Sequence, residues 1–237
     1  QSIPDAVALA RTAASLPGIE LAGLAFYPGH VRAHVTEHAP QLAQLAAFAR
    51  DARAAFAEAA LAHTVVSAGA TPTIWESHLI PGVTEMRPGT YIFNDRTTAE
   101  IGACTMDECA LTVLATVVST AVPNQAVIDA GTKALGREPV RGGPGEGFGC
   151  LLDRPEVVVK GMSEEHGLLD LSGTDWRPRV GDRVRVVPNH VCIVVHLADV
   201  VYGVRGGVLE RSWPVAARGR GQRPVEDPSG MTPSGRV

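Results

Sequence analysis

The chain has 237 residues, a formal net charge of -4 and a hydrophobic fraction of 45%, as expected for a globular protein with one large or two modest domains. Its arginines are scattered along the sequence, so we expect a small-molecule substrate and neither nucleic acid nor a membrane surface as a partner. No apolar run approaches the roughly 20 residues that span a bilayer, and the four cysteines show no Cys-x-x-Cys motif, which favours a reducing cytoplasm.

The first part of the chain, up to about residue 80, alternates short apolar runs with alanine-rich segments. Residues 18–25 and 64–66 are predicted strands, and residues 41–63 are a predicted helix because their apolar side chains mostly recur every three or four positions. Residues 67–73 would then form a loop at the end of the second strand. The pattern indicates a βα array with parallel strands.

From about residue 89 the pattern changes to short β-forming runs separated by glycine and proline, which predicts an all-β second domain. The tail at 217–237 is rich in Arg, Gly, Pro and Ser and is predicted to be disordered. The predicted strands of the second domain are 111–118, 126–130, 157–160, 183–187, 193–197, 200–204 and 208–215.

His190 and Cys192 are two residues apart between two of these predicted strands. Side chains at positions i and i+2 of an extended segment point to the same face, so both could bind one metal ion, with zinc as the first candidate. Two protein ligands would leave open positions for water or substrate. The alternative is a chance pair in which the cysteine is a small apolar residue.

Two loops of the first part contain further candidate residues. Backbone N–H groups of the loop 67–73, with the hydroxyls of Ser67, Thr71 and Thr73, could bind a phosphate; a plain strand-to-helix turn is the alternative. His30 follows the first predicted strand, where a neutral imidazole could take a proton from a substrate hydroxyl. The alternative for His30 is a solvent-facing loop histidine.

Several segments together resemble the C-terminal two-thirds of the D-threonine aldolase and D-serine dehydratase family, whose members are alanine-racemase-like pyridoxal-phosphate enzymes of fold type III that also use a divalent metal. The segments occur in the family's order between about residues 21 and 213. They are FYPGH (26–30), SAGATPT (67–73), EMRPGTYIFND (85–95), DAGTKAL (129–135), SEEHG (163–167) and PNHVC (188–192).

The resemblance implies a fold and two domains. Residues 1–88 would be the C-terminal part of a TIM (β/α)8 barrel that binds pyridoxal phosphate. Residues 89–216 would be a β-rich, metal-binding domain with a β-barrel-like fold, giving an α/β plus all-β chain. A homodimer is a further expectation.

The resemblance also implies roles for individual residues. His30 would be catalytic, and His190 and Cys192 would bind the metal. A thiolate ligand favours zinc over manganese or magnesium. The residues expected at the cofactor are Tyr27, Ser67, Thr71, Gly89, Thr90 and Tyr91.

The lysine that holds the cofactor as a Schiff base lies near the start of full-length family members. This chain contains only Lys133 and Lys160, both in the β-rich part. We therefore expect an N-terminal segment with that lysine and the first barrel strands to be missing from this sequence; if the sequence is complete, it should lack covalent pyridoxal-phosphate activity.

The expected activity is that of a lyase on D-β-hydroxy amino acids, with D-threonine aldolase-like cleavage to glycine and an aldehyde. The segment FYPGH resembles the aldolases, whereas Cys192 matches the His-x-Cys pair of the dehydratases. The alternatives are D-serine dehydratase-like deamination, amino-acid racemisation, and a non-catalytic binding protein or fragment that a partner chain completes.

Overall fold

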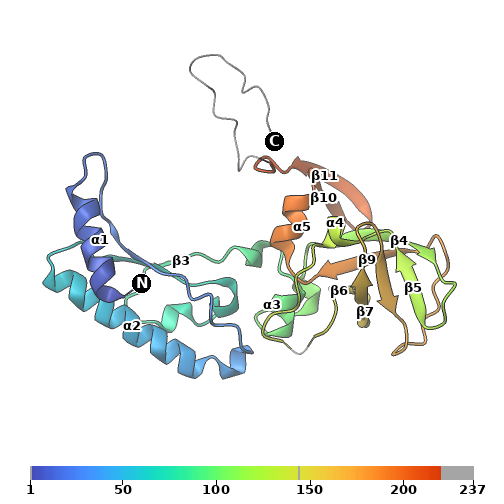
Figure 1. The fold of residues 1–237 in the computed structure, drawn as a ribbon, viewed down its shortest axis with the longest axis horizontal. Helices are drawn as coiled ribbons and strands as arrows, with labels where there is room; N and C mark the ends of the chain where they lie inside the picture. Colours follow the sequence, from blue (N-terminus) through green and yellow to red (C-terminus); the bar gives the residue numbers. More distant parts are fainter. Residues whose placement is uncertain (1, 144, 220–237) are drawn as a thin grey trace, which may run out of the picture.

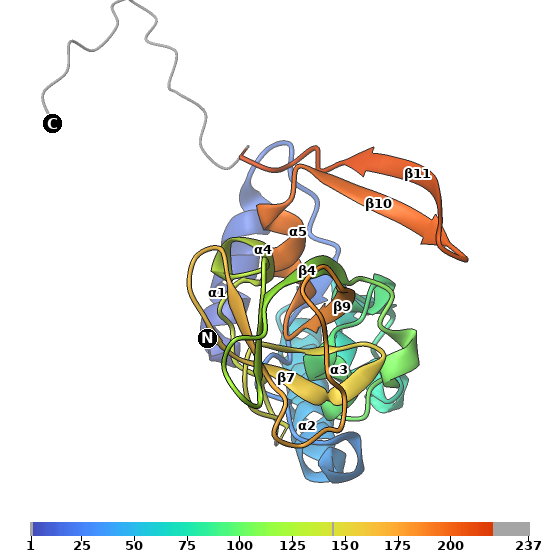
Figure 2. The ribbon, with the colours of Figure 1, turned by 90° about the vertical axis from the view of Figure 1, so that its right-hand side faces the viewer.

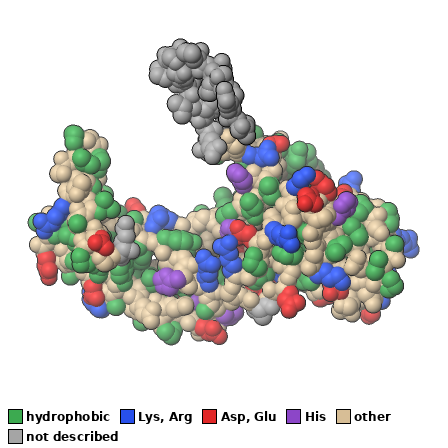
Figure 3. All heavy atoms as spheres, viewed as in Figure 1, with side chains coloured by type: hydrophobic (Ala, Val, Ile, Leu, Met, Phe, Trp, Pro, Cys, Tyr) green, Lys and Arg blue, Asp and Glu red, His purple; other side chains and the backbone are tan. Residues whose placement is uncertain are grey.

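The structure is a computed structural model that describes residues 2–143 and 145–219. Figure 1 shows two lobes side by side, an N-terminal lobe with two long helices and a C-terminal lobe built around a barrel. None of the helices in the described ranges is long and apolar enough to cross a membrane. Acidic and basic side chains are interspersed on the face in Figure 3.

The N-terminal lobe contains a three-stranded parallel sheet in the order β1-β2-β3. The chain enters the lobe through α1 (Ile3–Ser15), and α2 (Ala39–Glu58) connects the first two strands. The strands are β1 (Gly23–Ala25), β2 (Val65–Ala68) and β3 (Glu85–Met86). The predicted βα pattern is therefore confirmed, with a helix that ends five residues before the expected position 63.

The packing of α2 explains its pattern of apolar residues. Leu45 and Ala49 are buried four positions apart and pack against Val31 and Ile80, which lie outside the helix. Residues at this spacing share one face of a helix, so a single stripe of α2 is covered. The buried stripe fixes the helix beside the connections that flank the sheet.

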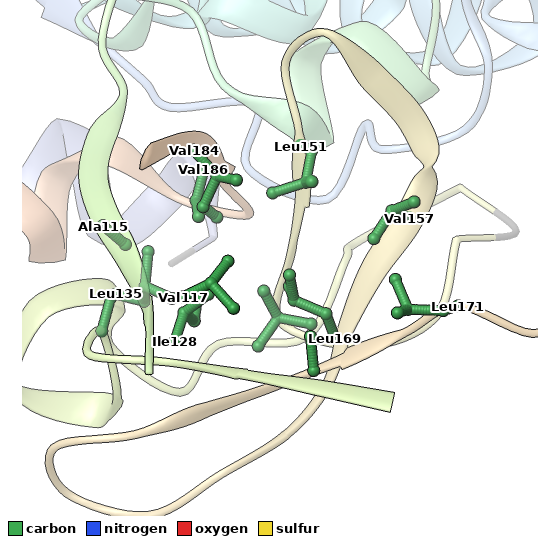
Figure 4. Packing of buried hydrophobic residues seen from close by; sticks show 13 residues of the cluster. Ala115, Val117, Ile128, Leu135, Leu151, Val157, Leu169, Leu171, Val184 and Val186 are labelled. Atoms are coloured by element: carbon green, nitrogen blue, oxygen red, sulfur yellow. The ribbon is translucent and has the colours of Figure 1, made fainter. Parts of the chain in front are cut away.

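The C-terminal lobe is a closed antiparallel barrel with the strand order β4-β5-β8-β7-β6-β9. Alternate residues of its strands point inward, and Val117, Ile128, Leu169 and Val186 are all 0% exposed in the core shown in Figure 4. The strands are β4 (Val113–Ser119), β5 (Gln125–Ile128), β6 (Gly149–Leu151), β7 (Arg154–Met162), β8 (Gly167–Asp170) and β9 (Arg183–Pro188). Closure leaves none of these strands as an open edge.

Three short helices and a hairpin complete the C-terminal lobe. The helices are α3 (Arg96–Glu100), α4 (Thr132–Leu135) and α5 (Val191–Leu197). The antiparallel hairpin of β10 (Val200–Arg205) and β11 (Val208–Pro214) projects away from the barrel, as Figure 2 shows.

The strand predicted at 193–197 is wrong, because these residues belong to α5. Their β-branched side chains favour a strand locally. However, Val191 and Val194 are buried together against Leu111, and their three-residue spacing fits one face of a helix. Tertiary packing overrides local propensity here.

The chain passes from the N-terminal lobe to the C-terminal lobe between β3 and β4. β3 ends at Met86 and β4 begins at Val113, with α3 in between; the boundary at 88 and 89 stays a prediction. Of the tail predicted to be disordered, only residues 217–219 fall in the ranges that the structure describes.

Candidate functional site

The side chain of Arg87 bridges the carboxyl ends of the neighbouring strands β1 and β2. Its Nε donates to Ser67 Oγ at 2.8 Å, and its Nη2 donates to the carbonyl oxygen of Phe26 at 2.8 Å. A fixed positive charge thus lies at the end of parallel strands, the edge where α/β sheets bind their ligands. Arg87 is not among the residues that the sequence predicts for the site, although it lies within the segment 85–95, which resembles the family.

A second contact brings the two predicted parts of the cofactor site together. The backbone N–H of Tyr91 donates to Thr71 Oγ1 at 3.2 Å. Ser67 and Thr71 are buried, Thr90 is half-buried, and Gly89 and Tyr91 are exposed. The loop after β2 and the segment after β3 therefore form one continuous surface.

Gly69 allows the loop after β2 to turn sharply. Its φ of +90° lies in a region that side chains disfavour, and an added Cβ would lie 3.0 Å from Ser77 Oγ. Ser77 in turn hydrogen-bonds Thr73 Oγ1 at 2.9 Å. The predicted hydroxyl of Thr73 is therefore occupied within the loop, which leaves Ser67 and Thr71 as the better anion donors.

Tyr27 and His30 lie on the loop that follows β1. Both side chains are exposed, Tyr27 at 68%, and neither makes a hydrogen bond to another of the described residues. Both residues follow the carboxyl end of β1, but no hydrogen bond among the described residues fixes either side chain, and their roles stay predictions.

The buried carboxylate of Asp95, at the end of the segment 85–95, holds the imidazole of His190. Its Nδ1 lies 3.0 Å from Asp95 Oδ2, and that oxygen also accepts the backbone N–H of Val191 at 3.2 Å. Because the carboxylate of Asp95, which is 1% exposed, accepts a hydrogen bond from Nδ1–H, the neutral imidazole has its lone pair on Nε2. A carboxylate behind one imidazole nitrogen is the usual arrangement of histidines that bind metals through the other.

Asp95 is itself fixed at the start of α3. Its Oδ1 accepts from the backbone N–H of Thr98 at 2.9 Å and from the Thr98 hydroxyl at 2.8 Å, which forms a capping box. Asp95 therefore caps a helix with one oxygen and orients His190 with the other. The Asp-x-x-Thr spacing could have identified the cap from the sequence, but not the contact with His190.

Asn189 anchors the end of β9 immediately before His190. Its amide nitrogen donates to the carbonyl oxygens of Glu138 and Gly147 at 2.9 and 2.8 Å, and Arg96 Nη1 lies 3.4 Å from its Oδ1. Arg96 and Asn189 are 4% and 1% exposed. These buried contacts restrict the backbone from which His190 projects.

The predicted geometry of the His190 and Cys192 pair is wrong, because the segment is not extended beyond His190. His190 is the N-cap of α5 with φ -147° and ψ 114°, and Cys192 lies in the first helical turn. Cys192 is exposed, His190 is 28% exposed, and Val191 between them is 2% exposed. Both polar side chains are therefore accessible on the outer side of a buried valine.

The described residues contain no cluster of three or more His, Cys, Asp and Glu side chains suited to a metal ion. The candidate metal centre therefore has at most His190 and Cys192 as protein ligands from this part of the chain. Such a site would keep open coordination positions.

The two lysines occupy the barrel lobe. Lys133 on α4 donates to Glu165 at 2.6 Å, which raises its pKa, and Lys160 on β7 lies 3.8 Å from Asp170. Neither lysine lies on the strands whose ends carry Ser67 and Arg87. The guanidinium of Arg87 and the hydroxyl of Ser67 are therefore suitable donors for the phosphate of the expected cofactor. Neither Lys133 nor Lys160 lies where it could bind the aldehyde of the same molecule.

Two family models match the chain in series. The model "Alanine racemase, N-terminal domain" matches residues 2–97, and the model "Putative serine dehydratase domain" matches residues 110–204. D-threonine aldolase of Arthrobacter sp. is 34% identical over 221 residues, which cover 90% of this chain and 55% of that protein. The chain therefore spans about half the length of this relative.

Solved structures show the same fold. D-threonine aldolase from Filomicrobium marinum has a TM-score of 0.78 and 29% identity, covering 92% of this chain and 59% of that chain. D-threo-3-hydroxyaspartate dehydratase from Delftia sp. HT23 has a TM-score of 0.72 and 29% identity, covering 90% and 60%.

Two mutants of a D-threo-3-hydroxyaspartate dehydratase also match this fold. One replaces a histidine by alanine, and the other replaces a cysteine by alanine and is in the metal-free form. The two mutated positions are two residues apart in that protein.

Proposed function

The chain belongs to the D-threonine aldolase and D-serine dehydratase family of alanine-racemase-like proteins, and we propose that it acts in a lyase for D-β-hydroxy amino acids that depends on pyridoxal phosphate and a divalent metal. The proposed reaction is retro-aldol cleavage to glycine and an aldehyde. The observation that carries the proposal is the His190 imidazole, which Asp95 holds through Nδ1 at 3.0 Å.

His190 and Cys192 would be the protein ligands of the metal. Nε2 of His190 would supply its lone pair, and Cys192, two residues further along and exposed, would bind as the thiolate. A thiolate ligand favours zinc. When bound, zinc would stabilise negative charge on the substrate hydroxyl and lower its pKa.

Arg87, Ser67 and Thr71 would bind the phosphate of the cofactor, with Gly89 and Thr90 beside them. The guanidinium supplies charge, and the hydroxyls and nearby backbone N–H groups supply donors. When bound, pyridoxal phosphate supplies an electron sink for the carbon that loses a substituent. Covalent attachment requires a lysine other than Lys133 and Lys160.

His30 is the proposed base. Its exposed imidazole on the loop after β1 could remove the proton of the substrate hydroxyl, which leads to carbon–carbon cleavage. Tyr27 on the same loop and Tyr91 on the segment after β3 would flank the cofactor. The cytoplasm is the proposed location, and a homodimer the proposed assembly.

Dehydration is the second candidate reaction. Removal of the α-proton and loss of hydroxide would release an enamino acid, whose imine tautomer reacts with water to give a 2-oxo acid and ammonia. The spacing of His190 and Cys192 supports it, because a dehydratase of this fold has a histidine and a cysteine at the same spacing among its mutated residues.

The products from D-threonine distinguish the candidates. Purified full-length protein with zinc should give glycine and acetaldehyde, whereas 2-oxobutanoate would identify a dehydratase, and the absence of both would refute a lyase acting on D-threonine. His190→Ala should abolish the metal-dependent turnover. His196→Ala, an exposed change on the same helix, should leave it unchanged.

A further inference from the structure

Three of the four cysteines lie together in the C-terminal lobe. Cys109 and Cys150 are 4% and 0% exposed and form a buried cluster with Val187, and the partly exposed Cys104 packs against it. The cluster is therefore accessible to solvent through Cys104.

A closed turn brings Cys104 and Cys109 beside each other. They flank a short 3-10 helix, Met106–Glu108. Thr105 donates its backbone N–H and hydroxyl to Glu108 Oε2 at 2.8 and 3.1 Å, and the N–H of Cys109 donates to Met106 O at 3.1 Å. Because the chain folds back on itself, residues on either side of the turn can reach the short Cα separation that a disulfide requires.

The three thiols differ in reactivity. The neighbouring Cys109 side chain is the main cause that lowers the pKa of Cys104, and the same pairing together with burial raises the pKa of Cys109. Burial raises the pKa of Cys150 to about 11. Of the three thiols Cys104 is partly exposed and the other two are buried, so an oxidant reaches Cys104 first. Because the thiolate is the reactive form, the pKa shifts favour the same order, with Cys104 as the nucleophile and Cys109 as the second thiol.

We propose that Cys104 and Cys109 form an oxidation site at which hydrogen peroxide converts the two thiols to an intramolecular disulfide. Cys104 Sγ attacks one peroxide oxygen, the O–O bond breaks, and one water leaves, which gives a sulfenic acid. Cys109 Sγ then displaces the remaining oxygen as a second water while the S–S bond forms. The two thiols lose two electrons and two protons, and the peroxide is reduced to two waters.

The surroundings favour a disulfide over further oxidation. Apolar side chains line the cluster, namely Ala99, Met106, Leu152 and Val158. A disulfide is neutral and fits such a lining, whereas a sulfinate would place an uncompensated charge in it. The sulfenic acid should therefore be resolved by Cys109.

A single side chain, that of Thr98, lies between Cys104 and Asp95, the carboxylate that holds His190. The Thr98 hydroxyl donates to Asp95 Oδ1 at 2.8 Å, and the Thr98 side chain lies beside Cys104, where it contributes to the lowered pKa of that thiol. Formation of the disulfide pulls Cys104 toward Cys109 and away from Thr98. The affinity of His190 for zinc should fall as a result; this second consequence depends on the proposed function.

Peptide mapping of the full-length protein after a brief exposure to hydrogen peroxide tests the site. Wild type and Cys150→Ala should both yield a peptide pair linked through Cys104 and Cys109, reversible with dithiothreitol. Cys109→Ser should stop at a sulfenic acid on residue 104 that dimedone labels. A disulfide to Cys150 or Cys192, or no disulfide at all, would overturn the proposal.

Zinc titration of the reduced and disulfide forms tests the link to His190. We expect binding to be about tenfold weaker after oxidation, the lower end of effects from residues behind a metal ligand. Equal affinity in both forms would overturn the link while leaving the disulfide intact. Failure of the reduced protein to bind zinc would instead refute the proposed metal site. The disulfide would still be tested by the peptide map, which does not depend on zinc.

Discussion

Asp95→Asn should weaken zinc binding strongly while keeping the cap of α3. In the native chain Oδ2 accepts from His190 Nδ1 at 3.0 Å and from the Val191 N–H at 3.2 Å. The asparagine can keep its oxygen toward Thr98, which preserves the helix cap, but its NH2 group then faces His190 and the N–H of Val191, which loses its acceptor. That arrangement favours a proton on Nε2, which removes the lone pair needed for the metal.

The magnitude follows from the role of the carboxylate. Loss of a group behind a metal-binding histidine typically reduces affinity about 10- to 100-fold, or about 1.4 to 2.7 kcal/mol. Asp95→Ala also removes the cap of α3 and should cost about 1 kcal/mol more in unfolding free energy. The difference between the two variants separates the stability effect from the metal effect.

The assay is competition for zinc against a chromophoric chelator, with urea unfolding measured on the same samples. Asp107→Asn is the control, because this exposed carboxylate lies on the neighbouring 3-10 helix and its side chain makes no hydrogen bond or ion pair with any of the described residues. If Asp95→Asn binds zinc within about twofold of wild type, Asp95 does not orient a metal ligand. If wild type itself does not bind zinc, the metal site is refuted instead.

Three further predictions address the cofactor, the pH dependence and the core. Arg87→Ala should weaken pyridoxal phosphate binding by about 1.5–3 kcal/mol, the value of a hydrogen bond to a charged group, as measured by absorbance titration. The backbone N–H and hydroxyl of Ser172 lower the pKa of Asp170 from 3.8, so its contribution to stability is present above that pH and is lost as the pH falls through the folded value. In Asp170→Asn, the urea concentration at the unfolding midpoint should therefore fall less than in wild type as the pH drops below 3.8. Ile128→Ala should destabilise by about 2–5 kcal/mol in urea, whereas Leu114→Ala, which is 63% exposed, should stay within about 0.5 kcal/mol.

The sequence patterns predict much of the fold because both lobes follow simple burial rules. The apolar stripe of α2 and the alternating strands of the barrel each bury one face, and periodicity detects that directly. α5 fails the same test, since its valines favour a strand locally and only their contact with Leu111 selects the helix. Local propensity carries no information about that contact.

The sequence predicts individual residues of the candidate site, but not its geometry. Residue types and the family resemblance indicate His190 and the loop containing Ser67 and Thr71. The partners that fix them are distant in sequence: Asp95 holds His190, and Arg87 holds Ser67. Such contacts depend on the tertiary fold, which spacing within one segment does not reveal.

A single short segment connects the two halves of the proposed site. The N–H of Tyr91 bonds to Thr71 in the N-terminal lobe, and four residues later Asp95 bonds to His190 in the C-terminal lobe. Between them Asn94 adopts a φ of +52°, which asparagine tolerates better than most residues, and its side chain donates to Glu108 O at 3.1 Å. Two further hydrogen bonds join the N-terminal lobe to the residues that follow α3: the Val35 N–H donates to Ile101 O at 2.9 Å, and Trp75 Nε1 donates to Ala103 O at 2.8 Å. This turn and these contacts together hold the proposed phosphate donors and the imidazole at a fixed separation, so the proposed lyase needs both to stay intact.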